Sequence, residues 1–128
     1  MTRLKCTVVT NEEQNWFVPF ARHLVEQLKR VADASLVFSH CAVYPSDIVF
    51  YLGYHSIVSD DVLALSGNNV VVHESNLPKG RGWTPLTWQV LEGHDQITLT
   101  LFEATTRVDA GPDLPSRATQ FQWHRTYR

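Results

Sequence analysis

The sequence predicts a small Rossmann-like α/β domain of three layers, with a mainly parallel sheet of about five strands. Two observations favour this fold class. Short apolar runs such as Val70–Val72 are almost unbroken, as in strands that are buried on both faces. Segments with helical spacing or turn residues separate these runs, and such alternation is typical of a parallel sheet that helices cover on both faces.

The individual elements follow from apolar periodicity and from the residues that end each run. Runs rich in β-branched and aromatic residues predict strands over Lys5–Thr10, Ser35–His40, Asp47–Tyr54, Asn69–Glu74 and Gln96–Thr105. Helical spacing predicts a helix that Asn15 caps, with an apolar face made of Phe17, Phe20, Ala21, Leu24, Leu28 and Val31. Shorter helices are predicted over Asp60–Leu65, led by Ser59, and over Pro85–Leu91.

A histidine and an aspartate follow two successive predicted strands. His73 leaves an apolar run and precedes a turn rich in proline and glycine, whereas Asp109 follows the last predicted strand. Strand ends on one edge of an open α/β sheet border the ligand crevice, so we expect His73 and Asp109 to meet there. An imidazole beside a carboxylate can move a proton near neutral pH.

One ordered pattern surrounds these two residues. It reads Val71-Val-His73-Glu-Ser75-Asn-Leu77-Pro78, then Arg81-Gly82 and Pro85, then Asp109-Ala-Gly111-Pro112. From Asp47 to Pro112, roughly half of the chain, the sequence resembles the formyltransferases that use formyl-tetrahydrofolate. The variant Gly-Arg-Gly-Trp-Thr-Pro-Leu-Thr-Trp is most similar to the branch that acts on amino sugars of surface glycans.

The resemblance implies a mechanism in which an amine attacks the formyl carbon and an oxyanion forms. His73 is then the donor to that oxygen, while Asp109 holds the ring and helps relay the proton of the amine. The family has an asparagine where this chain has Val71, and losing one such donor typically costs about 10²–10³ in rate. Asn76 is the expected substitute, because Asn69 lies about 13 Å from His73 along the strand.

The resemblance also implies a folate pocket and a substrate side. The cofactor-binding positions are Leu52, Gly53, Tyr54, His55, Ile57 and Val58 in the loop after the third strand, with Thr106 and Arg107 closing the other side. Lys79, Arg81 and Trp83 are candidate contacts of the acceptor. Ser75, Pro78 and Gly82 are expected to shape the turn that aims His73.

Several of these residues also have ordinary structural interpretations. His73 could bond a backbone group at a strand end, and Asp109 could cap the turn at Ala110–Gly111. Lys79 and Arg81 could be solvated loop charges. Ile57 and Val58 could pack into the core, as we expect for Trp88.

Two features depart from the family pattern. The phosphate-binding glycine loop of the family is absent from Thr10–Gln14, where two acidic residues stand, so anion binding there is expected to be poor. The connection Cys41–Ser46 is shorter than the ~10–12 residues of a parallel crossover, so a helix and a strand that are usual in the family are expected to be missing. Together with Val71, these features favour a second interpretation: a catalytically incompetent remnant of the fold, acting as a folate-binding or interaction module.

Composition bounds the partners and the compartment. A net charge of −2 and a pI of about 6.3 argue against a nucleic-acid-binding face. Because the sequence shows neither a membrane-spanning run nor a signal peptide, we expect a cytoplasmic protein. Cys6 and Cys41 stand in apolar contexts without the spacing of metal ligands, so we expect two buried thiols and no metal site. The implied partners are formyl-tetrahydrofolate and a small-molecule amine acceptor, first of all an amino-sugar nucleotide. Methionyl-tRNA is the second acceptor, and its formylation normally needs a separate basic domain.

The resemblance covers a compact domain over residues 1–112 and stops at residues 113–128, which show no helical or strand period. Codons chosen for this tail read in the next frame as IYLPEQRNFNGTELI, which is similar to the family's continuation. We therefore expect a single-base frameshift near Asp113, the loss of the last helix of the fold, and a tail that is irregular or borrowed into an interface between copies of the chain. The lost helix would uncover apolar surface, so we also expect a homo-oligomer.

Overall fold

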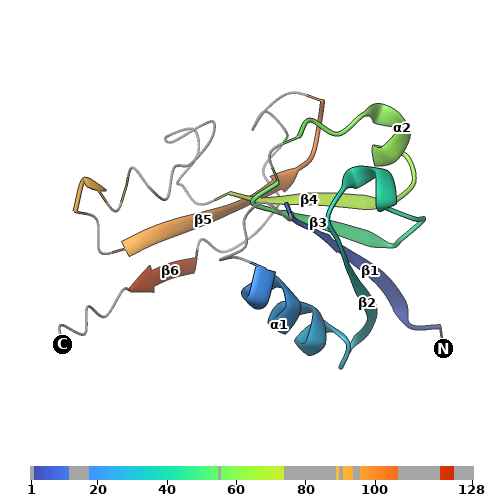
Figure 1. Ribbon diagram of the computed structural model, residues 1–128, viewed down its shortest axis with the longest axis horizontal. Coiled ribbons are helices and arrows are strands. Elements are labelled where there is room, and N and C mark those ends of the chain that lie inside the picture. The colour runs from blue at the N-terminus through green and yellow to red at the C-terminus, as the bar shows by residue number, and fades with distance from the viewer. Residues whose placement is uncertain are drawn as a thin grey trace.

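The computed structural model describes residues 2–11, 18–54, 56–73, 89, 91–93, 96–106 and 119–122. These residues form a six-stranded sheet in the order β2-β1-β3-β4-β5-β6 (Figure 1). The strands are β1 Leu4–Val9, β2 Ala32–Val37, β3 Ile48–Leu52, β4 Asn68–His73, β5 Gln96–Glu103 and β6 Thr119–Gln122. The helices are α1 Val18–Leu28, the 3-10 helix η1 His40–Ala42 and α2 Asp60–Leu63.

The first four strands are parallel to one another, whereas β5 and β6 each run antiparallel to the strand before them in the sheet. The predicted fold class, a mainly parallel α/β sheet, is therefore confirmed. Each predicted strand is present within a few residues of its expected bounds, and β6 is an addition.

Side chains alternate between the two faces of the sheet, and each face has its own cover. Val8 and Leu52 pack against Val25 of α1 on one face. Val9 and Tyr51 pack on the other face, where η1 and α2 lie (Figure 1). The expected three layers are present, and the central strand β1 carries fully buried side chains on both faces, Val8 on one and Val9 on the other.

Helix α1 contacts the sheet through a narrower stripe than its sequence predicts. Ala21 and Val25 are buried, and Leu28 packs beside them. Phe20 is 65% exposed and Leu24 is 38% exposed, so the expected apolar face that includes them is wrong. Residues four apart in sequence share one side of a helix, and here the stripe through Ala21 and Val25 is the one that faces the sheet.

The connection from β2 to β3 corrects two expectations. Strand β2 ends at Val37, before the predicted end at His40, so residues 38–47 are free to cross from one side of β1 to the other. Residues 40–42 form η1 on the surface, and Cys41 is exposed. The prediction of a buried Cys41 is wrong because the chain has already left the sheet, whereas Cys6 in β1 is buried as expected.

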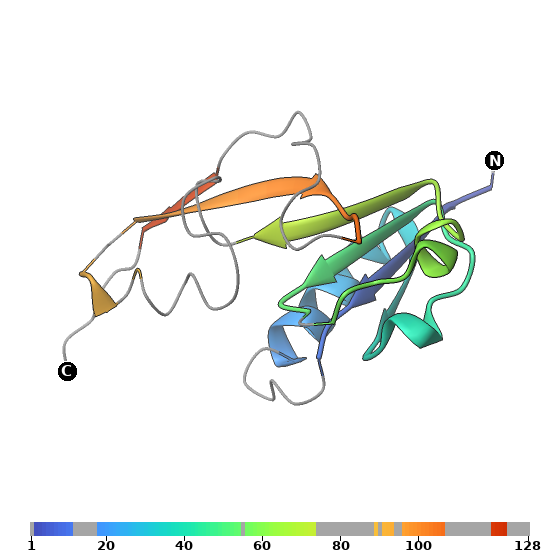
Figure 2. The same cartoon turned by 90° about the horizontal axis from the view of Figure 1, so that it is seen from above.

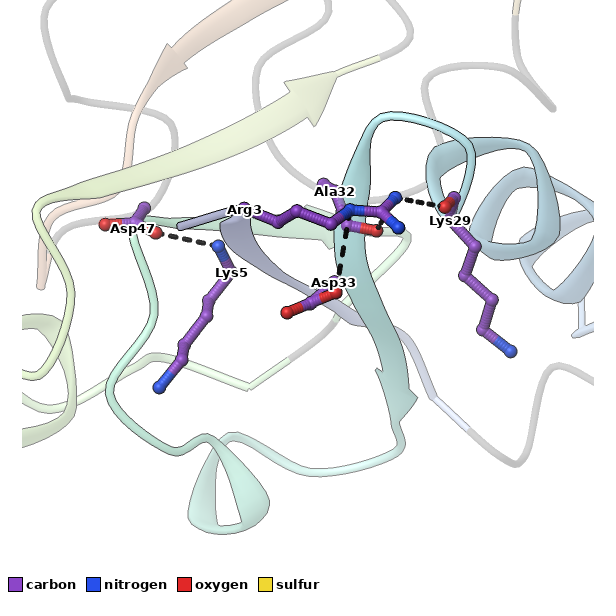
Figure 3. Close-up of polar contacts among 6 residues, drawn as sticks. All are labelled: Arg3, Lys5, Lys29, Ala32, Asp33 and Asp47. Atoms are coloured by element: carbon purple, nitrogen blue, oxygen red, sulfur yellow. Dashed lines mark hydrogen bonds and ion pairs between the residues drawn. The ribbon is translucent and has the colours of Figure 1, made fainter. Parts of the chain in front are cut away.

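The amino ends of the strands are tied together by polar contacts (Figure 3). The guanidinium of Arg3 donates to the carbonyl oxygens of Lys29 and Ala32, at the end of α1 and the start of β2, and pairs with Asp33. The backbone N–H of Lys5 donates to the carboxylate of Asp47 over 2.7 Å. Charged side chains thus fix the edge of the sheet that lies away from His73.

Strand β5 pairs with two partners along its length. Its second half, Thr100–Glu103, pairs with β4, and its first half, Gln96–Leu99, pairs with β6. Figure 2 shows that β5 begins beyond the carboxyl end of β4, near β6, and then runs back along β4. The four residues of β6 correct the prediction of an irregular tail, because the backbone of Gln96–Leu99 extends beyond β4 and can pair with a segment that lacks a clear strand pattern. The division at residue 112 stays a prediction.

No helix in the part of the chain that the structure describes is long and apolar enough to cross a membrane.

Candidate active site

His73 is the last residue of β4 and is 5% exposed. Its ring lies edge-on to the ring of Phe102, with 6.2 Å between the centroids, and its backbone pairs with Thr100 of β5. The β-branched run Val70–Val72 explains this position, because it forms a buried strand that ends at the histidine. A buried imidazole therefore stands at the carboxyl end of a parallel strand, where open α/β sheets bind ligands.

The direction of β5 differs from the expectation that it ends beside His73. Thr100 pairs with His73 and Glu103 pairs with Val70, so β5 ends toward the amino end of β4. Two successive strands end at the same edge only when they are parallel. Ala104, the residue after β5, packs in one core cluster with Val58 of the loop after β3, and Thr106 follows two residues later. The meeting of Asp109 with His73 stays a prediction because Asp109 lies outside the described residues.

Most of the motif after His73 also lies outside the described residues. This holds for Ser75, Asn76, Pro78, Lys79, Arg81, Gly82, Trp83 and Trp88, and for His55 and Arg107 of the expected folate pocket. Of the helix predicted over residues 85–91, Gln89 and Leu91 are described, and both are helical.

The loop after β3 carries the described part of the expected folate pocket. Gly53 has a φ of 57°, in the left-handed region that favours glycine. Val58 is buried in the core beside Tyr51, whereas Ile57 is 56% exposed. The side chain of Leu52 packs toward α1, on the opposite face, so Leu52 presents only its backbone to this loop.

The first strand and this loop meet at the point where the chain order of the sheet reverses. Strand β1 is flanked by β2 on one side and by β3 on the other, and such a switch point borders the crevice in this fold class. Asn11, just after β1, donates from its side-chain amide to the carbonyl oxygen of Gly53 over 3.3 Å. Thr10 is fully buried, and its hydroxyl makes no hydrogen bond to any described residue.

Tyr54 is fixed by a residue that the sequence did not assign to a site. The backbone N–H of His40 donates to the Tyr54 hydroxyl over 2.8 Å, and the Nδ1 atom of His40 lies 2.6 Å from the same oxygen. In the sequence, His40 is only the last residue of a predicted strand. The sequence pattern does not reveal this contact, because His40 and Tyr54 come together only when β2 and β3 lie on either side of β1.

Tyr51 lies directly beside Val71 in the register of β3 and β4 and is 3% exposed. Its hydroxyl makes no hydrogen bond within the described part of the chain. Burial, and then the neighbouring phenol of Tyr54, raise the pKa of Tyr51 to about 12. The hydroxyl is therefore a protonated donor at neutral pH.

Asn69 serves the fold rather than the reacting centre. Its amide nitrogen donates to the carbonyl oxygens of Leu63 and Ser66, over 2.8 and 3.4 Å, at the end of α2. This agrees with the sequence argument that Asn69 stands too far along the strand to assist His73.

No protein-family model matches the chain. Solved structures of similar fold include HypX from Aquifex aeolicus in complex with tetrahydrofolic acid, with a TM-score of 0.73 and 18% identity over 96% of this chain and 22% of that chain. A likely sugar N-formyltransferase from Mycobacterium tuberculosis gives a TM-score of 0.66 at 18% identity, over 93% of this chain and 56% of that chain. Methionyl-tRNA formyltransferase from Clostridium thermocellum gives a TM-score of 0.69 at 14% identity, over 93% of this chain and 54% of that chain.

The chain thus spans between 22% and 56% of the length of these structures. The fold expected from the sequence resemblance is the fold of these structures. This chain has the α/β fold of the formyltransferases.

Proposed function

We propose that the protein transfers a formyl group from formyl-tetrahydrofolate to an amine. The observation that carries this proposal is the buried His73 at the carboxyl end of β4, in a fold that it shares with a protein solved in complex with tetrahydrofolic acid. The amine nitrogen forms a bond to the formyl carbon, and the bond from that carbon to the folate nitrogen breaks. The proton that the amine loses passes to the folate nitrogen.

In this proposal His73 donates a hydrogen bond to the oxygen of the tetrahedral intermediate, and Asp109 orients the ring. Asn76 supplies the second donor in place of the family's asparagine. The reduced folate binds in the loop formed by Leu52, Gly53, Tyr54, His55, Ile57 and Val58, with Thr106 and Arg107 on the other side.

The acceptor that we propose is a nucleotide-linked amino sugar. Lys79 and Arg81 attract its anionic part, and Trp83 stacks on a ring of the substrate. The net charge of −2 makes methionyl-tRNA a weaker proposal, because a tRNA needs a basic face.

Titration with tetrahydrofolate, followed by formyl-transfer assays on amino-sugar nucleotides, tests the proposal. We expect His73→Ala to lower kcat by about 10²–10⁴ while folate affinity is kept. The control is His23→Ala, which changes an exposed histidine of α1 that contacts Gln27. Equal turnover in wild type and His73→Ala would remove His73 from the mechanism.

The second candidate is a folate-binding or interaction module without turnover, and Val71 is the observation that favours it. Val71→Asn separates the two functions. If the enzyme is merely weakened, this variant should raise turnover more than affinity, because the restored donor acts on the transition state. Binding of tetrahydrofolate with zero turnover in both proteins would favour the module.

A further inference from the structure

His40 holds Tyr54 at two points. The phenol oxygen accepts from the backbone N–H of His40, so the partner left for its own proton is the Nδ1 atom at 2.6 Å. The two rings also meet edge-on, with centroids 5.7 Å apart and planes at 81°. A neutral His40 with its proton on Nε2 satisfies both contacts.

This contact fixes the loop after β3 from outside the loop. Tyr54 follows Gly53, whose backbone is in the left-handed region and whose carbonyl oxygen accepts from Asn11. The Tyr54 ring also lies 5.8 Å from the ring of Tyr51 in β3, measured between centroids. The start of the loop is therefore held from β1, from β3 and from η1.

We propose that His40 is a positioning residue for the folate-binding loop, and that it acts through Tyr54. The inference rests on the proposed folate-binding function. A loop that is ordered before the ligand arrives spares the ligand the entropic cost of ordering it. His40 therefore tunes folate affinity without contact with folate, and the short connection between β2 and β3 gains a functional role.

His40→Ala and His40→Asn test the role of Nδ1. The alanine variant keeps the backbone N–H contact but removes the acceptor, and losing one hydrogen bond of this kind should weaken tetrahydrofolate binding about fivefold to tenfold. The asparagine variant places Oδ1 close to the position of Nδ1, so it should restore most of the affinity. Because the loop acts in binding alone, kcat at saturating folate should stay unchanged in both variants.

Tyr54→Phe removes both hydrogen bonds and should weaken binding at least as much as His40→Ala. His23→Ala is the matched control and should leave folate affinity unchanged, since His23 lies on α1 and contacts Gln27. Unchanged affinity in His40→Ala, or equal losses in the alanine and asparagine variants, would overturn the positioning role.

Amide hydrogen exchange tests the contact without folate. The loop amides should exchange faster in His40→Ala than in wild type, and in His40→Asn their rates should return to those of wild type. The amides concerned are Gly53, Tyr54, Ser56, Ile57 and Val58, while β1 should stay protected. If wild-type protein fails to bind tetrahydrofolate, the proposed function is wrong, and His40 then holds the loop without tuning folate. If the loop exchanges equally in all variants, the positioning role is wrong although the proposed function stands.

Discussion

The hydroxyl of Tyr51 is buried, yet it makes no hydrogen bond to the residues that the structure describes. A buried polar group in this state costs roughly 1–3 kcal/mol. Tyr51→Phe should therefore leave the free energy of unfolding of the ligand-free protein unchanged or raise it by about 1 kcal/mol. Urea unfolding followed by tryptophan fluorescence measures this difference.

The matched change Tyr54→Phe should have the opposite sign. It removes two hydrogen bonds to His40 and should cost about 1–2 kcal/mol. If Tyr51→Phe is the more destabilising of the two, a bound water satisfies the Tyr51 hydroxyl and the expectation is wrong.

The phenol of Tyr51 also makes the free energy of unfolding depend on pH in the alkaline range. The pKa of Tyr51 is raised to about 12 in the folded protein, above about 10 in an unfolded chain. The unfolded state therefore releases this proton first. Protonated Tyr51 therefore contributes its full share to the free energy of unfolding below about pH 10. This contribution falls by an amount on the order of 2 kcal/mol as the pH rises toward about 12. Unfolding curves at about pH 8 and pH 11 should show a smaller loss for Tyr51→Phe than for wild type.

Residue positions were predictable where local sequence decides them. The run Val70–Val72 places His73 at a strand end, and burial follows from the same run. The contact between His40 and Tyr54 was not predictable, because it depends on how the chain crosses β1. The exposure of Cys41 was missed for the same reason.

At the scale of elements, the loop after β3 depends on the backbone of Gly53. A side chain in the left-handed region costs roughly 1–2 kcal/mol. Gly53→Ala should therefore destabilise the protein by about 1 kcal/mol and also weaken the proposed folate binding, because its φ of 57° is strained for alanine.

Gly67→Ala is the control for this change. A Cβ atom at Gly67 would lie 3.6 Å from the carbonyl oxygen of Asp47, an ordinary van der Waals distance. Thermal unfolding of both variants, with tetrahydrofolate titration, makes the comparison. Equal shifts in Tm would mean that the backbone of Gly53 relaxes without cost.

The antiparallel direction of β5 could not be predicted from periodicity. Parallel and antiparallel strands share the same two-residue alternation, so the run from Gln96 to Glu103 predicts a strand without its direction. The direction is decided by which free edge the strand reaches. That tertiary choice also determines where Thr106 and the segment toward Asp109 begin.

At the scale of the whole molecule, α1 presents an uncovered apolar stripe. Phe20 and Leu24 are 65% and 38% exposed and lie one turn apart. We predict that the double change Phe20→Ser and Leu24→Ser reduces self-association, because large exposed apolar side chains favour contact with a second surface. Sedimentation velocity over a range of protein concentrations measures the change.

Val25→Ala provides the contrast. Val25 is buried on the side of α1 that packs against the sheet, and its truncation should lower the free energy of unfolding by roughly 1–3 kcal/mol without preventing association. A wild-type protein that stays monomeric over the whole concentration range would contradict the expected homo-oligomer.

Strands β4 and β6 pair with different halves of β5 and do not pair with each other. The ladder to β4 uses Thr100–Glu103, and the ladder to β6 uses Gln96–Leu99, so each ladder can open without breaking the other. Opening the ladder between β5 and β6 therefore leaves the hydrogen bonds of the parallel strands intact. The amides of Thr100–Glu103 that donate to β4 should exchange only with global unfolding, whereas the amides of Gln96–Leu99 that donate to β6 should exchange through a local opening of lower free energy. A change in the sequence of β6 would then alter the second rate while the fold around His73 persists.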